Sequence, residues 1–196
     1  MSTRKNLALR EAVPLDAQAL VLLSKQFTSI LGCTPTLGKT VDQVNSHLRN
    51  TNQRIVVLSE SKKCVNGIKE SLLLGYCLSE LVEMPGEQSG DARKYGVKVW
   101  DLFIEKEHRA RKLSSFLLVK ALILHGLETK VAPTLVTPPA MFLANASANK
   151  LYKSFGYRSV QGVSTQLING VEQVKAAVAN ALSWYETGGG KLAGLS

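Results

Sequence analysis

The chain has 196 residues, and its 24 Lys and Arg outnumber its 15 Asp and Glu, which gives a formal net charge of +9. This length fits a single domain with a hydrophobic core of its own. The charge favours an anionic ligand, either nucleic acid, an anionic membrane surface or a phosphorylated small molecule. No apolar stretch approaches the roughly 20 residues that span a bilayer, which excludes an ordinary membrane-spanning helix.

The three cysteines, Cys33, Cys64 and Cys77, predict neither a disulfide framework nor a metal centre. Their number is odd, no pair has CxxC spacing, and no paired histidines accompany them. Residues 1–14 contain only a short apolar run and lack the hydrophobic core of a signal peptide. We therefore expect reduced thiols, no metal, no membrane partner and a cytoplasmic location.

The first part of the chain predicts one strand and two helices. Residues 7–12 have the alternating character of a strand. A helix then begins at Pro14, continues to about residue 30 and ends at Gly32. A second, more polar helix is expected over about residues 40–50.

The middle of the chain predicts a hairpin and a buried strand. Residues 54–60 and 70–83 are rich in branched apolar residues and flank a polar segment with Asn-Gly, as in an antiparallel hairpin. Gly75 marks a bulge or a close approach of two backbones. Residues 84–95 form a loop, and the almost continuously apolar residues 97–105 form a strand buried on both faces.

The rest of the chain alternates helices with short strands. The expected elements are a helix over 114–125 capped by Gly126, a strand over 134–137, a helix over 145–155, strands over 157–160 and 164–168, and an amphipathic helix over 171–185. This order predicts an α/β fold with one mixed sheet of six to seven strands, helices on both faces and an extra C-terminal helix. Ligands bind such sheets at the carboxyl ends of strands, which directs attention to the turn after residue 105.

That turn, residues 105–115, joins the buried strand to a helix and is strongly basic. The two serines at 114–115 are candidate helix caps, and the first N–H groups and dipole of the helix favour an anion. Arg109, Arg111 and Lys112 add positive charge. The turn therefore suits a pyrophosphate, although a basic strand-to-helix turn is also common on ordinary protein surfaces.

Residues 100–118, WDLFIEKEHRARKLSSFLL, resemble the first signature of the GNAT superfamily of acyl-CoA-dependent N-acyltransferases. That signature is an apolar strand, a charged turn and R-x-x-G-x-G/A at the start of a helix. Arg109 takes the arginine position, whereas Lys112 and Ser114 replace the two glycines. Glycine there lets the backbone approach phosphates and adopt positive φ. Lys112 either reaches the phosphates as a point charge or marks a repurposed site.

Residues 145–157, NASANKLYKSFGY, resemble the second signature of the family, N-x-x-A-x-x-L-Y-x-x-x-G-F. The other interpretation of this segment is a capped amphipathic helix with a core tyrosine. The two signatures occur in the order and at the spacing of the family, which favours the resemblance. The positions in register are Asn145, Ala148, Leu151, Tyr152, Gly156 and Tyr157.

The resemblance implies roles for several residues. Tyr152 would donate a proton to the departing CoA thiolate, since a phenol with a pKa near 10 stays protonated at neutral pH. A backbone N–H within 101–105 would polarise the acyl oxygen. The residues implied in acetyl-CoA binding are Phe103, Ile104, Arg109, Ala110, Arg111, Lys112, Leu113, Ser114, Ser115, Asn145 and Tyr152.

The general base is less evident, because Trp100 takes the position at which many relatives have a glutamate. Asp101, Glu105 and Glu80 are the carboxylates best placed to deprotonate an ammonium, directly or through water. Each of them also has an ordinary interpretation as a structural or surface acid. A water chain without a dedicated base is a further alternative.

The resemblance implies an N-acetyltransferase that moves an acetyl group from acetyl-CoA to a primary amine of a small molecule or protein by direct attack. A catalytically weak GNAT-fold module that binds nucleic acid or a protein through its basic face is the alternative, and an unrelated α/β fold is the third hypothesis. We expect an acyltransferase domain over 1–168, an appended helix over 169–186 and a flexible tail over 187–196. A homodimer is compatible with the family.

Overall fold

The computed structural model describes residues 6–32, 34–63, 69–83, 95–109, 112–125, 134–136, 146–154, 158–160, 163–167, 176, 179–180, 183, 186–187 and 191–194. Its elements are β1 (Asn6–Glu11), the short 3-10 helix η1 (Pro14–Asp16), α1 (Ala17–Leu31), α2 (Val41–Arg49), β2 (Gln53–Lys63), β3 (Lys69–Glu83), β4 (Tyr95–Ile104), η2 (Lys106–His108), α3 (Leu113–Leu124), β5 (Thr134–Val136), α5 (Ala146–Ser154), β6 (Arg158–Val160), β7 (Val163–Leu167) and β8 (Lys191–Ala193). The predicted α/β class and the hairpin are confirmed, as is the predicted order of helices and strands from β1 to β7.

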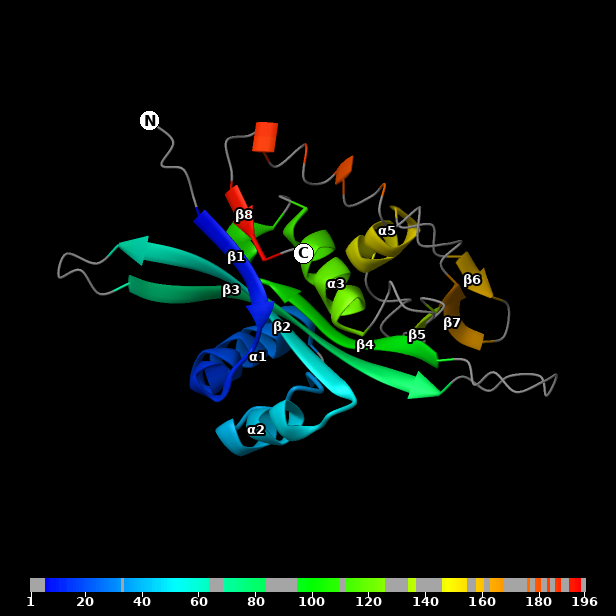
Figure 1. Ribbon diagram of the computed structural model, residues 1–196. Helices are drawn as coiled ribbons and strands as arrows, with labels where there is room; N and C mark the ends of the chain where they lie inside the picture. Colours follow the sequence, from blue (N-terminus) through cyan, green and yellow to red (C-terminus); the bar gives the residue numbers. More distant parts are fainter. Residues whose placement is uncertain are drawn as a thin grey trace.

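One mixed sheet organises these elements, with strand order β6-β7-β5-β4-β3-β2-β1-β8. The pairs β4–β5 and β1–β8 are parallel, and the other pairs are antiparallel. Helices α1 and α2 cover one face of the sheet, and α3 and α5 lie on the other (Figure 1). The fold is therefore a three-layer α/β arrangement in which each face of the sheet has its own core.

The sheet has eight strands among the described residues, one more than the upper end of the predicted range. The additional strand, β8, lies within 187–196, where a flexible tail was expected, and pairs with β1. Leu192 packs against the core, and a Cβ on Gly194, at φ 83°, would lie 2.0 Å from the Leu9 carbonyl oxygen. Because this segment is rich in glycine, its sequence does not predict a strand. The strand becomes evident only from its pairing with β1.

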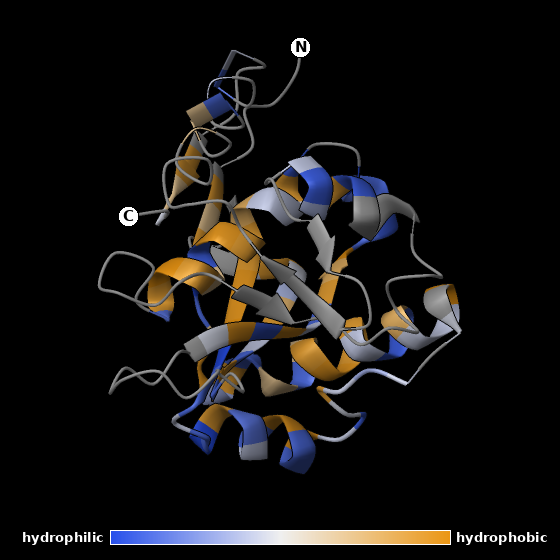
Figure 2. Ribbon diagram, turned by 90° about the vertical axis from the view of Figure 1, so that its right-hand side faces the viewer, coloured by the Kyte–Doolittle hydropathy of each residue, from blue (hydrophilic) through white to orange (hydrophobic). Residues whose placement is uncertain are grey.

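Apolar residues separate into two cores on the two faces of the sheet. The core under α3 contains Val97 and Val99 of β4 and most of α3, which is buried on nearly every side. The core under α1 and α2 contains Phe27, Tyr76 and Phe103. In Figure 2 the hydrophobic colour is concentrated along the central strands and the helices packed on them. Strand β4 contributes to both cores, as the sequence predicts for a strand buried on both faces.

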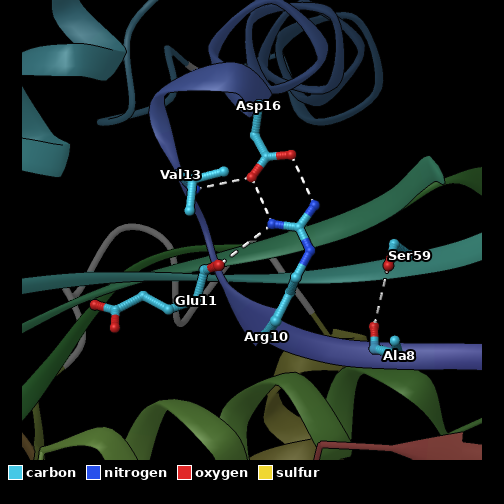
Figure 3. A network of polar contacts seen from close by, with 6 residues as sticks. All are labelled: Ala8, Arg10, Glu11, Val13, Asp16 and Ser59. Carbon is cyan, nitrogen blue, oxygen red and sulfur yellow. Dashed lines mark hydrogen bonds and ion pairs between the residues drawn. The ribbon is translucent and has the colours of Figure 1, made fainter.

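Polar contacts fix the helices to the sheet. The Asp16 carboxylate accepts two hydrogen bonds from the Arg10 guanidinium, at 2.6 and 2.8 Å, and one from the Val13 N–H, at 2.8 Å (Figure 3). At the end of α1, Gly32 has φ 68°, as expected for a terminating glycine. Thr40 caps α2 and accepts a hydrogen bond from the Gln43 N–H. The predicted helix ends are thus confirmed at Gly32 and Thr40.

The predicted C-terminal helix over 171–185 is described only in part. Its described residues, Ala176, Ala179, Asn180 and Ser183, are helical and exposed, as are Glu186 and Thr187 beyond it. Among the described residues, none of the helices combines the length and apolarity needed to cross a bilayer. The same residues contain no group of three His, Cys, Asp or Glu side chains arranged to hold a metal ion.

Candidate active site at the turn after strand β4

Strand β4 is irregular at Trp100. Across from it on β3, Leu78 pairs with Asp101 and Ser79 pairs with Val99, so Trp100 is an extra residue, a β-bulge. The bulge turns the side chains on either side of it to opposite faces. Val99 therefore packs in the core under α3, whereas the Asp101 side chain faces the loop between α1 and α2.

The other edge of β4 loses its partner at the same place. The parallel pairing with β5 joins only Val97 to Leu135 and Lys98 to Val136. Beyond Lys98, this edge of β4 has no paired strand among the described residues. Backbone N–H and C=O groups along an unpaired strand edge need a hydrogen-bond partner other than a neighbouring strand.

The turn after β4 brings a left-handed residue to the start of α3. Lys112 is the N-cap of α3 and has φ 57° and ψ 13°, and it is the one non-glycine residue with positive φ among those described. This is the position at which the family signature has a glycine. The first N–H groups of α3 follow directly and, like those of any helix, lack intrahelical acceptors.

The serines do not cap this helix. Ser114 and Ser115 were expected as caps, but the N-cap is Lys112, which makes no side-chain capping hydrogen bond. The left-handed conformation of Lys112 starts the helix at Leu113, so both serines lie inside its first turn. Ser115 is buried, and its N–H donates to the Lys112 carbonyl at 3.0 Å. The capping prediction is therefore wrong.

Arg109 holds the turn against the end of β4. Its Nε donates to the Ile104 carbonyl at 2.9 Å, and its guanidinium carbon lies 5.4 Å from the centre of the Phe103 ring. The side chains of Phe103, Ile104 and Leu113 are buried at 2%, 7% and 2% exposure. These three predicted cofactor residues can therefore offer a ligand only their backbone atoms, whereas Ser114 is partly exposed.

Tyr152 of α5 lies in the same core as Ile104 and Leu113 and is 6% exposed. Burial, together with the nearby Cys77, raises the pKa of the Tyr152 phenol above its ordinary value. The phenol therefore stays protonated throughout the physiological range. The structure thus brings Tyr152 to the face of the sheet that carries α3, next to predicted cofactor residues.

Asp101 is engaged by the backbone of the loop between α1 and α2. Its two carboxylate oxygens accept the N–H groups of Thr36 and Leu37 at 3.0 and 2.8 Å, and the Tyr76 hydroxyl lies 3.5 Å away. The side chain is 1% exposed. Burial raises the pKa of Asp101, while the two N–H groups and the nearby His47 act to lower it. Asp101 therefore anchors this loop.

The other two candidate bases lie apart from Asp101. Glu105 is at the turn, where its carboxylate oxygens lie 3.7 Å from His108 Nδ1 and 3.4 Å from Gln26 Nε2 of α1. Glu80 is on β3 and accepts a hydrogen bond from Trp100 Nε1 at 2.6 Å. The structure does not gather the three carboxylates into one cluster. Only Glu80 reaches the residue that replaces the family's usual glutamate.

Three predicted cofactor residues, Ala110, Arg111 and Asn145, lie outside the described residues. One residue next to this site was not predicted from the sequence. Lys98 lies two positions before Trp100 on the same face of β4, and its Nζ is 3.3 Å from the centre of the Trp100 ring. The two-residue spacing was the available signal, because side chains at i and i+2 of a strand share a face.

No protein-family model and no curated protein matches the chain. Solved structures do match. Arabidopsis thaliana NAA60, in complex with a bisubstrate analogue, has a TM-score of 0.59 at 14% identity, over 80% of this chain and 87% of that one. A predicted acetyltransferase with acetyl-CoA from Clostridium acetobutylicum has a TM-score of 0.55 at 14% identity, covering 80% and 92%.

A third match names the fold. The GNAT family N-acetyltransferase YhbS from Escherichia coli, in complex with CoA, has a TM-score of 0.52 at 16% identity, covering 85% of this chain and 82% of that one. The chain therefore has the GNAT fold, as its two signatures predict. At sequence identities this low, structural similarity shows only that the backbones are arranged alike. The chemistry must be argued from the residues of this chain.

Proposed function

We propose that the chain is an N-acetyltransferase that moves the acetyl group of acetyl-CoA to a primary amine. The observation that carries the proposal is the backbone of Lys112, which adopts the left-handed conformation of a glycine at the signature position. The turn thus keeps the form of an anion-binding helix start although the glycine is missing. Acetyl-CoA bound by structures of this fold supports the choice of co-substrate.

The proposed step is direct attack. The amine nitrogen attacks the thioester carbonyl carbon, a C–N bond forms, and the C–S bond breaks as the tetrahedral intermediate collapses. A backbone N–H on the open edge of β4 beyond Lys98 would stabilise the oxyanion. The CoA sulfur takes a proton from the Tyr152 hydroxyl as the C–S bond breaks, the amine releases one to a base or to water, and Tyr152 regains its proton from solvent. Asp101 is not our choice of base, because its oxygens bind the loop backbone.

Acetyl-CoA binding is the first test. A ligand that binds only the native state at 100 times its dissociation constant adds about 2.7 kcal/mol of stability. We therefore expect acetyl-CoA to raise the melting temperature in a thermal-shift assay. No shift at millimolar acetyl-CoA would remove the basis of the proposal.

Replacing the proposed proton donor is the second test. In Tyr152→Phe we expect kcat for CoA release to fall about 100-fold, with the acetyl-CoA thermal shift retained. Tyr76→Phe is the matched control, since Tyr76 is also buried but lies in the opposite core. Full turnover in Tyr152→Phe, or an equal loss in both variants, would contradict the role of Tyr152.

The acceptor, a homodimer, a cytoplasmic location and the domain boundary at 168 remain proposals from the sequence. If acetyl-CoA bound without turnover, the same assays would favour the alternative function, a catalytically weak binding module. In that case binding to nucleic acid should weaken steeply with salt.

A further inference from the structure

A partly exposed cluster of side chains lies on the side of the sheet that carries α1 and α2. Its members are Lys98, Trp100 and Glu80. Lys98 and Glu80 face each other across the β3–β4 ladder. Trp100 packs against the core under α1 and α2, and its indole N–H donates to Glu80 Oε2 at 2.6 Å. The indole thus holds the carboxylate beside its own ring.

The Lys98 ammonium lies on the ring. Its Nζ is 3.3 Å from the Trp100 ring centre. Although Lys98 and Glu80 are directly opposite residues, both within the described part of the chain, their charged groups form no ion pair there. An aromatic face with a carboxylate at its edge is a favourable place for a primary ammonium, because the ring quadrupole and the negative charge both attract a cation.

We propose that Trp100 and Glu80 form the subsite for the primary ammonium of the acceptor, and that Lys98 fills this subsite with its own ammonium when no acceptor is bound. This inference rests on the proposed function and adds the class of acceptor, a primary alkylammonium such as a lysine side chain.

The position of the group on β4 supports this role. Trp100 is the bulge residue, and the open edge of β4 begins at the same point. A protein with net charge +9 repels cations at a distance, so a cationic acceptor needs a local carboxylate. Glu80 supplies this carboxylate without being bound by loop backbone, in contrast to Asp101.

The subsite can be tested without acetyl-CoA. The chain has two tryptophans, so a Trp184→Phe background leaves Trp100 as the single indole reporter. Titration with n-butylammonium should then change the Trp100 fluorescence to saturation. In Lys98→Met the internal competitor is gone, and we expect about fivefold tighter binding. Lys25→Met, at an exposed position of α1, removes the same charge and should leave the affinity unchanged.

Glu80→Gln provides the opposite change. It keeps the size of the side chain and removes its charge, so n-butylammonium should bind about fivefold more weakly. Equal affinity in Lys98→Met and the parent, an equal gain in Lys25→Met, or unchanged affinity in Glu80→Gln would each overturn the subsite. Far-ultraviolet circular dichroism establishes that each variant is folded.

These results separate the subsite from the proposed function. Acetyl-CoA binding and turnover with unchanged n-butylammonium affinity in all variants would refute the subsite and leave the acetyltransferase standing. Ammonium binding that follows the expected order, without any acetyl-CoA binding, would support an ammonium site at Trp100 and Glu80 but refute both the acetyltransferase and the role of this site in binding an acetyl acceptor.

Discussion

Glycine at position 112 should be more stable than alanine there, because Lys112 has a left-handed backbone. An L-residue in the left-handed region costs roughly 1–2 kcal/mol, and Lys112 has φ 57°. Glycine avoids that cost, but its greater flexibility in the unfolded chain lowers the free energy of unfolding by about 0.5–1 kcal/mol. The backbone contribution alone is therefore a gain of about 0.5–1 kcal/mol, or roughly 1–4 °C in melting temperature for a chain of this length, before the loss of the lysine side-chain contacts is counted.

The comparison that isolates the backbone is Lys112→Gly against Lys112→Ala. Both variants lose the contacts of the lysine side chain, but only alanine retains a Cβ in the left-handed conformation. Guanidinium denaturation should show the glycine variant more stable by about 1 kcal/mol. A glycine variant no more stable than the alanine variant would refute the left-handed turn, and with it the main support for the anion site.

Three further substitutions test the framework of the site. Gly75→Ala should lose about 1–3 kcal/mol of unfolding free energy, because the new Cβ would lie 2.4 Å from the Phe103 carbonyl oxygen. Asp101→Ala should lose about 2–4 kcal/mol, since two backbone N–H groups of the α1–α2 loop lose their acceptor. Burial acts to raise the pKa of Asp16, but Arg10 and a backbone N–H hold it below its ordinary value. Its stabilisation is present above about pH 4 and is lost as pH falls through the lowered pKa, so the deficit of Asp16→Asn should narrow in acid.

Each of these expectations has a control. Ser71→Ala, exposed on β3, should be nearly neutral beside Gly75→Ala, and Asp42→Ala, exposed on α2, should cost well under 1 kcal/mol beside Asp101→Ala. If Gly75→Ala and Ser71→Ala have the same denaturation curve, the close approach of Gly75 to the Phe103 carbonyl is contradicted. If Asp101→Ala and Asp42→Ala have the same curve, the role of Asp101 in holding the α1–α2 loop is contradicted. A constant gap between Asp16→Asn and the parent from pH 6 to pH 3 would contradict the lowered pKa.

Local features of the sequence determined most of the helices and strands and the α/β class. Thr40 with Gln43 caps α2 because both groups lie within one turn, and Gly32 ends α1 because it accepts positive φ. The spacing of apolar residues that predicted the strands depends on side chains two residues apart. Such signals need no knowledge of the rest of the chain, so the sequence alone was sufficient for them.

The tertiary structure decided which site residues are available and what they contact. Asp101 is bound by N–H groups 64 and 65 residues away, and β8 pairs with β1 from the opposite end of the chain. The bulge at Trp100 depends on its register with β3, which brings Glu80 to its indole. Lys112 departs from the family's glycine in the sequence, yet its backbone is left-handed, as a glycine's can be. These outcomes depend on long-range packing and hydrogen bonding, which residue spacing does not encode.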